Sequence, residues 1–314
     1  MTAVRRRWLR VAALLILAVL LVAFGRHVDW RAAATAARGA DVGLLVLALV
    51  VNQISLALKA VRWWVFLRPL GVLSLWLVVR ATFAGASLNN LVVAQGGEGA
   101  RVLLVARATG VSSARVAAAL ALERVLDAMS YLVLLVSAAW MMDLPEMLLR
   151  WRTAASVALA VVVVALMMLS RRSASQVPRR GLGTTVKAYA QRFTSSASDI
   201  ATPGRLVVGL LLSLGAWALQ VATYHTVALA AHLPISLSGT IAAFLAVGIS
   251  FLIRATPGNV GVFQMIYAMT ARGFGIAESP AVATALLIQT IQVLPTIAIG
   301  TLMSHGLIGR APDE

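Results

Sequence analysis

Charged side chains lie inside apolar segments of this 314-residue chain, where a charge has to be paired or reach water. Three are acidic and four are basic: Glu98, Glu123, Asp127, Arg80, Arg101, Arg124 and Arg254. Glu123 and Asp127 are four residues apart and so share one face of a predicted helix, with Arg124 three residues before Asp127. We therefore expect one band of opposite charges on this helix.

Arginine suits phosphate recognition, because its planar guanidinium offers two parallel N–H donors. We predict a polar cavity lined by Arg101, Arg124 and Arg254, which would hold a phosphate-bearing headgroup. Three acids would balance charge or couple protons there: Glu98, Glu123 and Asp127. The alternative is that these residues form only ion pairs that lock helices together.

Two glycine-rich polar stretches interrupt the apolar segments, the first from Ser87 to Arg101 and the second from Arg254 to Gln264. Paired breaks in two halves of a hydrophobic chain point to a transporter-type site. The helix N-termini at the breaks would add N–H donors to an anion site. The predicted break residues are Gly96, Gly97, Gly99, Pro257, Gly258 and Gly261. Amide side chains that would pair the freed backbone or contact the headgroup are Asn89, Asn90, Gln95 and Gln264.

The composition indicates an all-α polytopic membrane protein, with 61% hydrophobic and 12% charged residues and a mean hydropathy of +0.90. The chain has no cysteine, its four histidines share no spacing, and it carries no catalytic or nucleotide-binding motif. We therefore expect no metal, no cofactor and no enzymatic activity. The net charge of +16 fits basic cytoplasmic loops beside anionic lipid, and no nucleic-acid-binding motif accompanies it.

The apolar segments predict six full crossings and two re-entrant hairpins within a single membrane domain, 1–314. The expected segments are 9–24, 42–61, 72–94, 116–140, 153–170, 205–231, 236–253 and 280–305, and the hairpins are 72–109 and 236–271. The run from Val11 to Phe24 follows several arginines like a signal peptide but lacks a clear cleavage site, so we expect it to remain as a helix. Placing both termini in the cytoplasm puts seventeen basic residues inside, Arg62 among them, and six outside.

The two halves of the chain read as an inverted repeat, because this topology gives them opposite orientations. The first repeat is 42–140 and the second is 205–305, joined by a basic cytoplasmic linker at 171–204. An offset of 163 residues aligns Gly85 with Gly248 and Ser87 with Ser250.

Four motifs in order along the chain resemble a known family. They are Leu58-Lys-Ala-Val-Arg62-Trp63, Gly96-Gly-Glu-Gly-Ala-Arg101, Glu123-Arg124-Val-Leu-Asp127 and Thr256-Pro-Gly-Asn-Val-Gly261 with Gln264. The chain is similar to the flippase-like family named after the transmembrane region of bacterial lysylphosphatidylglycerol synthase. The resemblance implies a protein that moves lipids between leaflets, with the breaks as re-entrant segments. It does not include the synthase's soluble aminoacyl-transfer domain, and Gln264 and Asn259 stand where many relatives have Glu and Gly.

We expect a flippase-like transporter of the bacterial cytoplasmic membrane. Its partner would be an anionic phospholipid or a polyprenyl-phosphate-linked sugar. One alternative is a non-transporting scaffold for an envelope-lipid enzyme or glycosyltransferase. A membrane-embedded lipid-modifying enzyme is a third interpretation, for which the chain supplies no metal or nucleotide site.

Overall fold

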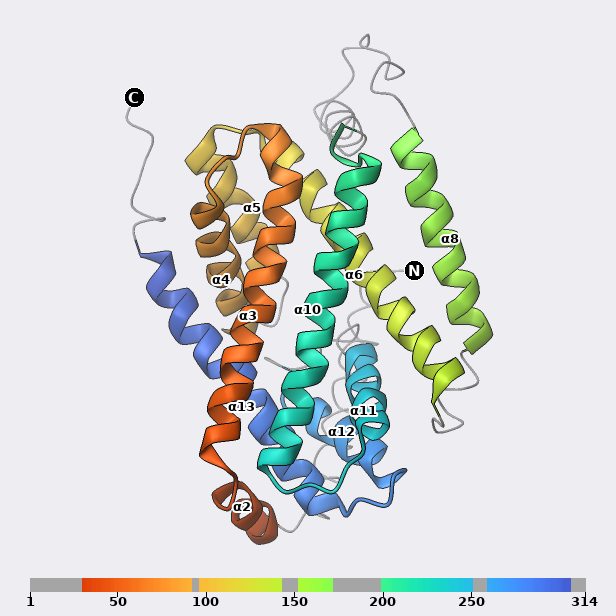
Figure 1. The fold of residues 1–314 in the computed structure, drawn as a ribbon. Coiled ribbons are helices and arrows are strands. Elements are labelled where there is room, and N and C mark those ends of the chain that lie inside the picture. Colours follow the sequence, from red (N-terminus) through yellow and green to blue (C-terminus); the bar gives the residue numbers. More distant parts are fainter. Residues whose placement is uncertain (1–29, 92–95, 143–151, 172–198, 251–258, 306–314) are drawn as a thin grey trace, which may run out of the picture.

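The computed structural model describes residues 30–91, 96–142, 152–171, 199–250 and 259–305. Within these ranges every regular element is a helix (Figure 1). The first half contains α2 (Trp30–Arg38), α3 (Val42–Leu67), the short η1 (Arg68–Leu70), α4 (Leu75–Leu91), α5 (Gly96–Thr109), α6 (Ser113–Met141) and α8 (Arg152–Arg171). The second half contains α10 (Pro203–Ala230), α11 (Leu237–Ser250), α12 (Val262–Arg272) and α13 (Glu278–Ser304).

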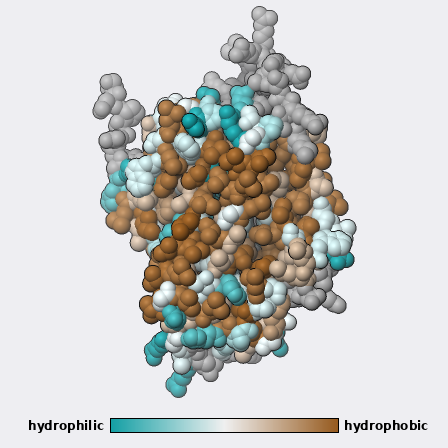
Figure 2. All heavy atoms as spheres, in the orientation of Figure 1, coloured by the Kyte–Doolittle hydropathy of each residue, from teal (hydrophilic) through white to brown (hydrophobic). Residues whose placement is uncertain are grey.

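The chain is a membrane protein, because long helices present apolar side chains outward. Three stretches are long and apolar enough to cross a bilayer: Val42–Leu70, Pro203–Ala230 and Glu278–Ser304. Valine, leucine and isoleucine side chains are exposed along α3, α8, α10 and α13. Figure 2 shows the result on one face, a hydrophobic belt with hydrophilic residues gathered toward its two ends.

The remaining helices differ from these spans in charge or in length. Helix α6 has 29 residues but carries Glu123, Arg124 and Asp127, and it runs obliquely across the bundle (Figure 1). Helices α4, α5, α11 and α12 have 17, 14, 14 and 11 residues. At about 1.5 Å per residue they reach roughly 16–26 Å, short of a hydrocarbon core of about 30 Å. The predicted segment 42–61 ends too early, because α3 continues to Leu67, and the end of the predicted segment 72–94 lies outside the described residues.

The helix contacts repeat between the two halves of the chain. In the first half, α3 packs on α4, α4 on α5, and α6 on both α5 and α3. In the second half, α10 packs on α11, α11 on α12, and α13 on both α12 and α10. The contacts between the halves correspond as well. The α4–α13 contact has its counterpart in the α11–α6 contact, and the α3–α13 contact has its counterpart in the α10–α6 contact. The closest pair is α3 with α10, which run in opposite directions (Figure 1).

Two hydrophobic cores lie at opposite ends of this α3–α10 pair. One core gathers around the end of α3, with Trp63, Phe66 and Leu67, and includes α4, α5 and α6. The other gathers around the end of α10, with Tyr224 and Val227, and includes α11, α12 and α13. The α4–α5 pair therefore lies toward one end of the bundle and the α11–α12 pair toward the other (Figure 1).

Glycine allows the short helices to touch backbone to backbone. A Cβ atom added to Gly97 would lie 2.0 Å from the carbonyl oxygen of Gly85, so α4 and α5 approach more closely than any side chain permits. A Cβ on Gly300 would lie 2.3 Å from the carbonyl oxygen of Phe83, which brings α13 equally close to α4. These contacts position α5, and with it Glu98 and Arg101, against the rest of the bundle.

Candidate functional site

Arg62 is the centre of a charged cluster, although the sequence analysis placed it among the cytoplasmic basic residues. Its side chain is not in a loop, since it is 0% exposed in the core between α3, α6 and α10. Its Nη1 atom donates to Asp127 Oδ1 and to Ser213 Oγ, both at 2.6 Å. Its Nη2 atom donates to Glu123 Oε1 at 2.8 Å and to Asp127 Oδ2 at 3.1 Å. One guanidinium therefore joins three helices.

A sequence signal for Arg62 exists in the spacing of polar residues on α3. Asn52, Ser55 and Arg62 are buried and recur at the three- and four-residue steps that place them on one helix face. Ser55 Oγ donates to the carbonyl oxygen of Ala216 at 2.8 Å, so this face packs on α10. Because α3 continues unbroken to Leu67, Arg62 stays within the packed helix instead of reaching a loop.

Glu123 is the second buried member of the cluster, at 1% exposure. Its two oxygens are divided between two arginines, since Oε1 accepts from Arg62 and Oε2 accepts from Arg101 Nη2 at 2.7 Å. A carboxylate held by two guanidinium groups has its charge compensated and its acceptor positions occupied. Glu123 thus joins α6 to α3 and to α5.

Arg101 lies in an ion pair, as the alternative interpretation of the sequence described. Its guanidinium is buried, contacts Glu123 and Glu98, and lies 4.0 Å from the centre of the Trp63 ring. Little of this group is open to a headgroup. The ion pair and the cation–π contact together hold α5 against α3 and α6.

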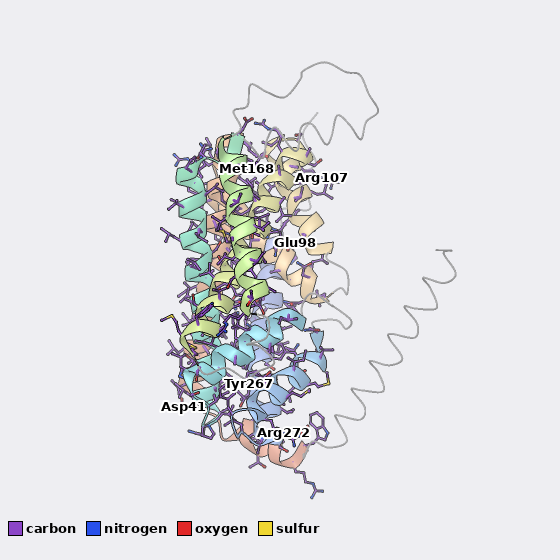
Figure 3. All side chains as sticks on the ribbon, turned by 90° about the vertical axis from the view of Figure 1, so that its right-hand side faces the viewer. Asp41, Glu98, Arg107, Met168, Tyr267 and Arg272 are labelled. Atoms are coloured by element: carbon purple, nitrogen blue, oxygen red, sulfur yellow. The ribbon has the colours of Figure 1, made fainter. Side chains whose placement is uncertain are left out.

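Arg124 differs from the other two arginines, because half of its side chain is exposed. Its Nη2 atom lies 2.7 Å from Glu98 Oε1, and its Nη1 atom lies 3.6 Å from Asp127 Oδ2. Glu98 is the link between Arg124 and the α4–α5 pair, and Figure 3 shows it part-way along the bundle. Arg124 is therefore the guanidinium of the cluster that an external anion reaches most easily.

Lys59 adds a fourth positive charge near the cluster. Its amine lies 5.8 Å from the centre of the Trp217 ring, whose Nε1 atom donates to Asp127 Oδ1 at 3.3 Å. Lys59 interacts electrostatically with Asp127 but forms no salt bridge within 4 Å among the described residues. The described cluster thus sets three arginines against three carboxylates, with the Lys59 amine nearby.

Amide side chains cap the helices that begin after the two breaks. Asn89 Oδ1 accepts from the backbone N–H of Gly97 at 2.9 Å, and its Nδ2 atom donates to Glu98 at 3.4 Å. Gln264 Oε1 accepts from the N–H of Gly261 at 2.7 Å, and its Nε2 atom donates to Gln289. Asn90 is half-buried in α4. The predicted site residues Gln95, Arg254, Pro257 and Gly258 lie outside the described residues.

The second half has a neutral contact where the first half is charged. Gln289 on α13 follows Arg124 on α6 by 165 residues, and its hydrogen bond to Gln264 joins α12 to α13 as the salt bridge from Glu98 to Arg124 joins α5 to α6. Arg80, the remaining interior arginine, donates to the carbonyl oxygens of Met303 and His305 and so caps the end of α13. No three His, Asp or Glu side chains of the described ranges form a metal-ligand group.

A mainly apolar cavity of about 380 Å³ lies between α4, α5 and α13. Leu88, Leu104 and Gly300 line it, together with Ser87 and Arg107. Arg107 is exposed, lies six residues after Arg101 on α5, and is seen near one end of the bundle in Figure 3. An apolar cavity with a basic side chain beside it has the polarity of a phospholipid, apolar for the acyl chain and positive for the phosphate.

The fold and the cluster define a class, a helical membrane protein that buries a charged network among α3, α5 and α6, with α10 packed against it. The particular family follows from its sequence. The chain belongs to the family described as lysylphosphatidylglycerol synthase TM region, whose model matches residues 10–300. A comparison with curated proteins finds no match for this chain.

Proposed function

We propose that this protein is a flippase-like transporter that moves an anionic lipid between the leaflets of the bacterial cytoplasmic membrane. The observation that carries the proposal is the half-exposed guanidinium of Arg124, which lies at the open side of the charged cluster. A guanidinium at membrane depth needs anionic partners, and the exposed half of Arg124 can accept a further one. The family, named for a protein region linked to a phospholipid, supports the same conclusion.

The architecture in this proposal is an inverted repeat of six crossings and two re-entrant hairpins. Its support is the matching contact pattern of the two halves and the shortness of α4, α5, α11 and α12. The end of the bundle with Arg107 and Arg205 would face the cytoplasm, since basic residues gather on that side. Both termini would then be cytoplasmic.

The headgroup would bind by replacing a carboxylate that is already present. Glu98 forms a salt bridge with Arg124 at 2.7 Å, and a phosphate offers the same kind of oxygen acceptors. When a lipid phosphate replaces Glu98 as the partner of Arg124, Glu98 would still interact with Arg101 and Asn89. The ion pairs of Arg62 with Glu123 and Asp127 would stay intact and hold the bundle together while the phosphate replaces Glu98 at Arg124.

The acyl chains need not cross any polar region in this scheme. They would stay in the bilayer or enter the apolar cavity between α4, α5 and α13. In this proposal Arg101 would position α5 through its ion pairs, and Arg124 would contact the lipid. Lys59 would supply the long-range attraction that favours an anion over a zwitterionic headgroup.

Reconstitution into liposomes tests this function. The purified full-length protein is incorporated into vesicles that contain fluorescently labelled phosphatidylglycerol or phosphatidylcholine, and a membrane-impermeant quencher reports the outer leaflet. We expect faster exchange of the anionic lipid than in protein-free vesicles. No exchange of either this lipid or a polyprenyl-phosphate-linked sugar, by protein that still shows its native thermal unfolding, would favour the scaffold alternative.

A further inference from the structure

A second basic pocket lies apart from the charged cluster, where α3 ends and α10 begins. It encloses about 430 Å³ and is lined by Trp64, Val65, Arg68, Pro69, Leu73 and Arg205. Two of these six residues are arginines and none is acidic. The described residues place no carboxylate in a salt bridge with either arginine, in contrast to the cluster around Arg62.

The described groups that orient both arginines are uncharged: an aromatic ring and backbone carbonyl oxygens. The Arg68 guanidinium lies 5.4 Å from the centre of the Trp64 ring. Trp64 is itself fixed, because its Nε1 atom donates to the carbonyl oxygen of Leu73 at 3.1 Å. Arg205 Nη1 donates to the carbonyl oxygens of Asp199 at 3.2 Å and Ile200 at 3.5 Å. Among the described residues these are the hydrogen bonds of Arg205, and both go to backbone carbonyls.

The pocket lies at the depth of lipid headgroups. Arg68 follows the last residue of α3, and Arg205 is in the first turn of α10, so both stand at the end of a membrane-length apolar helix. Hydrophilic residues gather at this end of the molecule in Figure 2. Tryptophan and arginine together at a helix end are typical of the interface between hydrocarbon and water. Basic pockets between helices at this depth suit phosphate headgroups.

We infer that this pocket binds the phosphate of an anionic phospholipid, at a site separate from the transport cluster. Two guanidinium groups would grip the phosphate oxygens, and the Trp64 ring would pack against the glycerol region. The bound lipid would bridge α3 and α10, the closest helix pair of the fold. A soluble phosphate has the same charged atoms, so the lipid and the free ion have to be separated by experiment.

Native mass spectrometry of the full-length protein tests this site. The protein is released from micelles that contain phosphatidylglycerol or phosphatidylcholine, with and without inorganic phosphate in excess. We expect retained phosphatidylglycerol in the wild type, about fivefold weaker retention in Arg68→Gln or Arg205→Gln, and roughly thirtyfold weaker in the double variant. Arg68→Lys and Arg205→Lys should lose less, because they keep the charge.

Two comparisons make the outcome specific to this pocket. Arg115→Gln changes an arginine of α6 outside the pocket and should retain the lipid as the wild type does. Arg124→Gln should also retain this lipid, even though transport through the cluster is slowed. Wild-type retention in the double variant would overturn the inference, as would equal retention of phosphatidylcholine. Displacement of the lipid by inorganic phosphate would identify the ligand as the soluble ion instead.

Discussion

Replacing Arg62 with methionine should strongly destabilise the protein, because it removes the group at the centre of the cluster. Arg62 is fully buried and donates four hydrogen bonds to three side chains on α6 and α10. Without it, Asp127 loses both of its short contacts and Glu123 keeps only Arg101 as a close partner. Removing one partner of a buried ion pair costs about 3–5 kcal/mol, since a charge is left uncompensated.

The assay is the free energy of unfolding in mixed micelles titrated with SDS. Arg115→Met is the matched control, because Arg115 is half-buried on α6 without a salt bridge among the described residues, and its change should stay within about 0.5 kcal/mol. The double variant Arg62→Met, Asp127→Asn restores part of the charge balance, so it should recover on the order of 1–3 kcal/mol relative to the sum of the single variants. A loss below about 1 kcal/mol for Arg62→Met, or strict additivity in the cycle, would refute the idea that the cluster holds these helices together.

Three further outcomes follow from the packing. Gly97→Ala should destabilise the α4–α5 pair, because its Cβ would lie 2.0 Å from a carbonyl oxygen. The control Gly99→Ala places its Cβ where no atom lies within 4 Å, so this variant should unfold like the wild type. Equal unfolding of the two variants would contradict the close contact. Arg80→Met should speed hydrogen exchange in the last turn of α13, whose carbonyls it caps, and unchanged exchange would count against the cap. Since the chain has no native cysteine, Arg107→Cys and Arg272→Cys can each be labelled in cells: an impermeant reagent should reach only the second, and the reverse would invert the proposed orientation.

The charged band was predictable because it depends on spacing within one helix. Glu123, Arg124 and Asp127 are close in the chain, and helical geometry alone places them together. Their isolation in an apolar chain marked them as important. The helix start at Gly96 was predictable from the glycine-rich interruption of the apolar pattern, whereas residues 92–95 and 251–258 of the two breaks lie outside the described residues.

The partners of those residues were not predictable, because they come from other helices. Arg62 reaches Glu123 and Asp127 across more than sixty residues of chain, and its distance from a loop depends on where α3 ends. The same holds for Arg101, for which the sequence analysis favoured a phosphate ligand over an ion pair. Spacing on the chain reports which residues share a helix face, but the contact between faces is decided by packing.

Arg124 carries the central claim, so its substitution is the most direct measurement. Liposomes with the wild type, Arg124→Gln or Arg115→Gln are compared for the rate at which labelled phosphatidylglycerol crosses the bilayer. A hydrogen bond to a charged group contributes about 1.5–3 kcal/mol, so we predict that Arg124→Gln slows exchange by about tenfold or more while Arg115→Gln exchanges at the wild-type rate. Exchange by Arg124→Gln at the wild-type rate, with the protein folded, would contradict a headgroup site at the cluster.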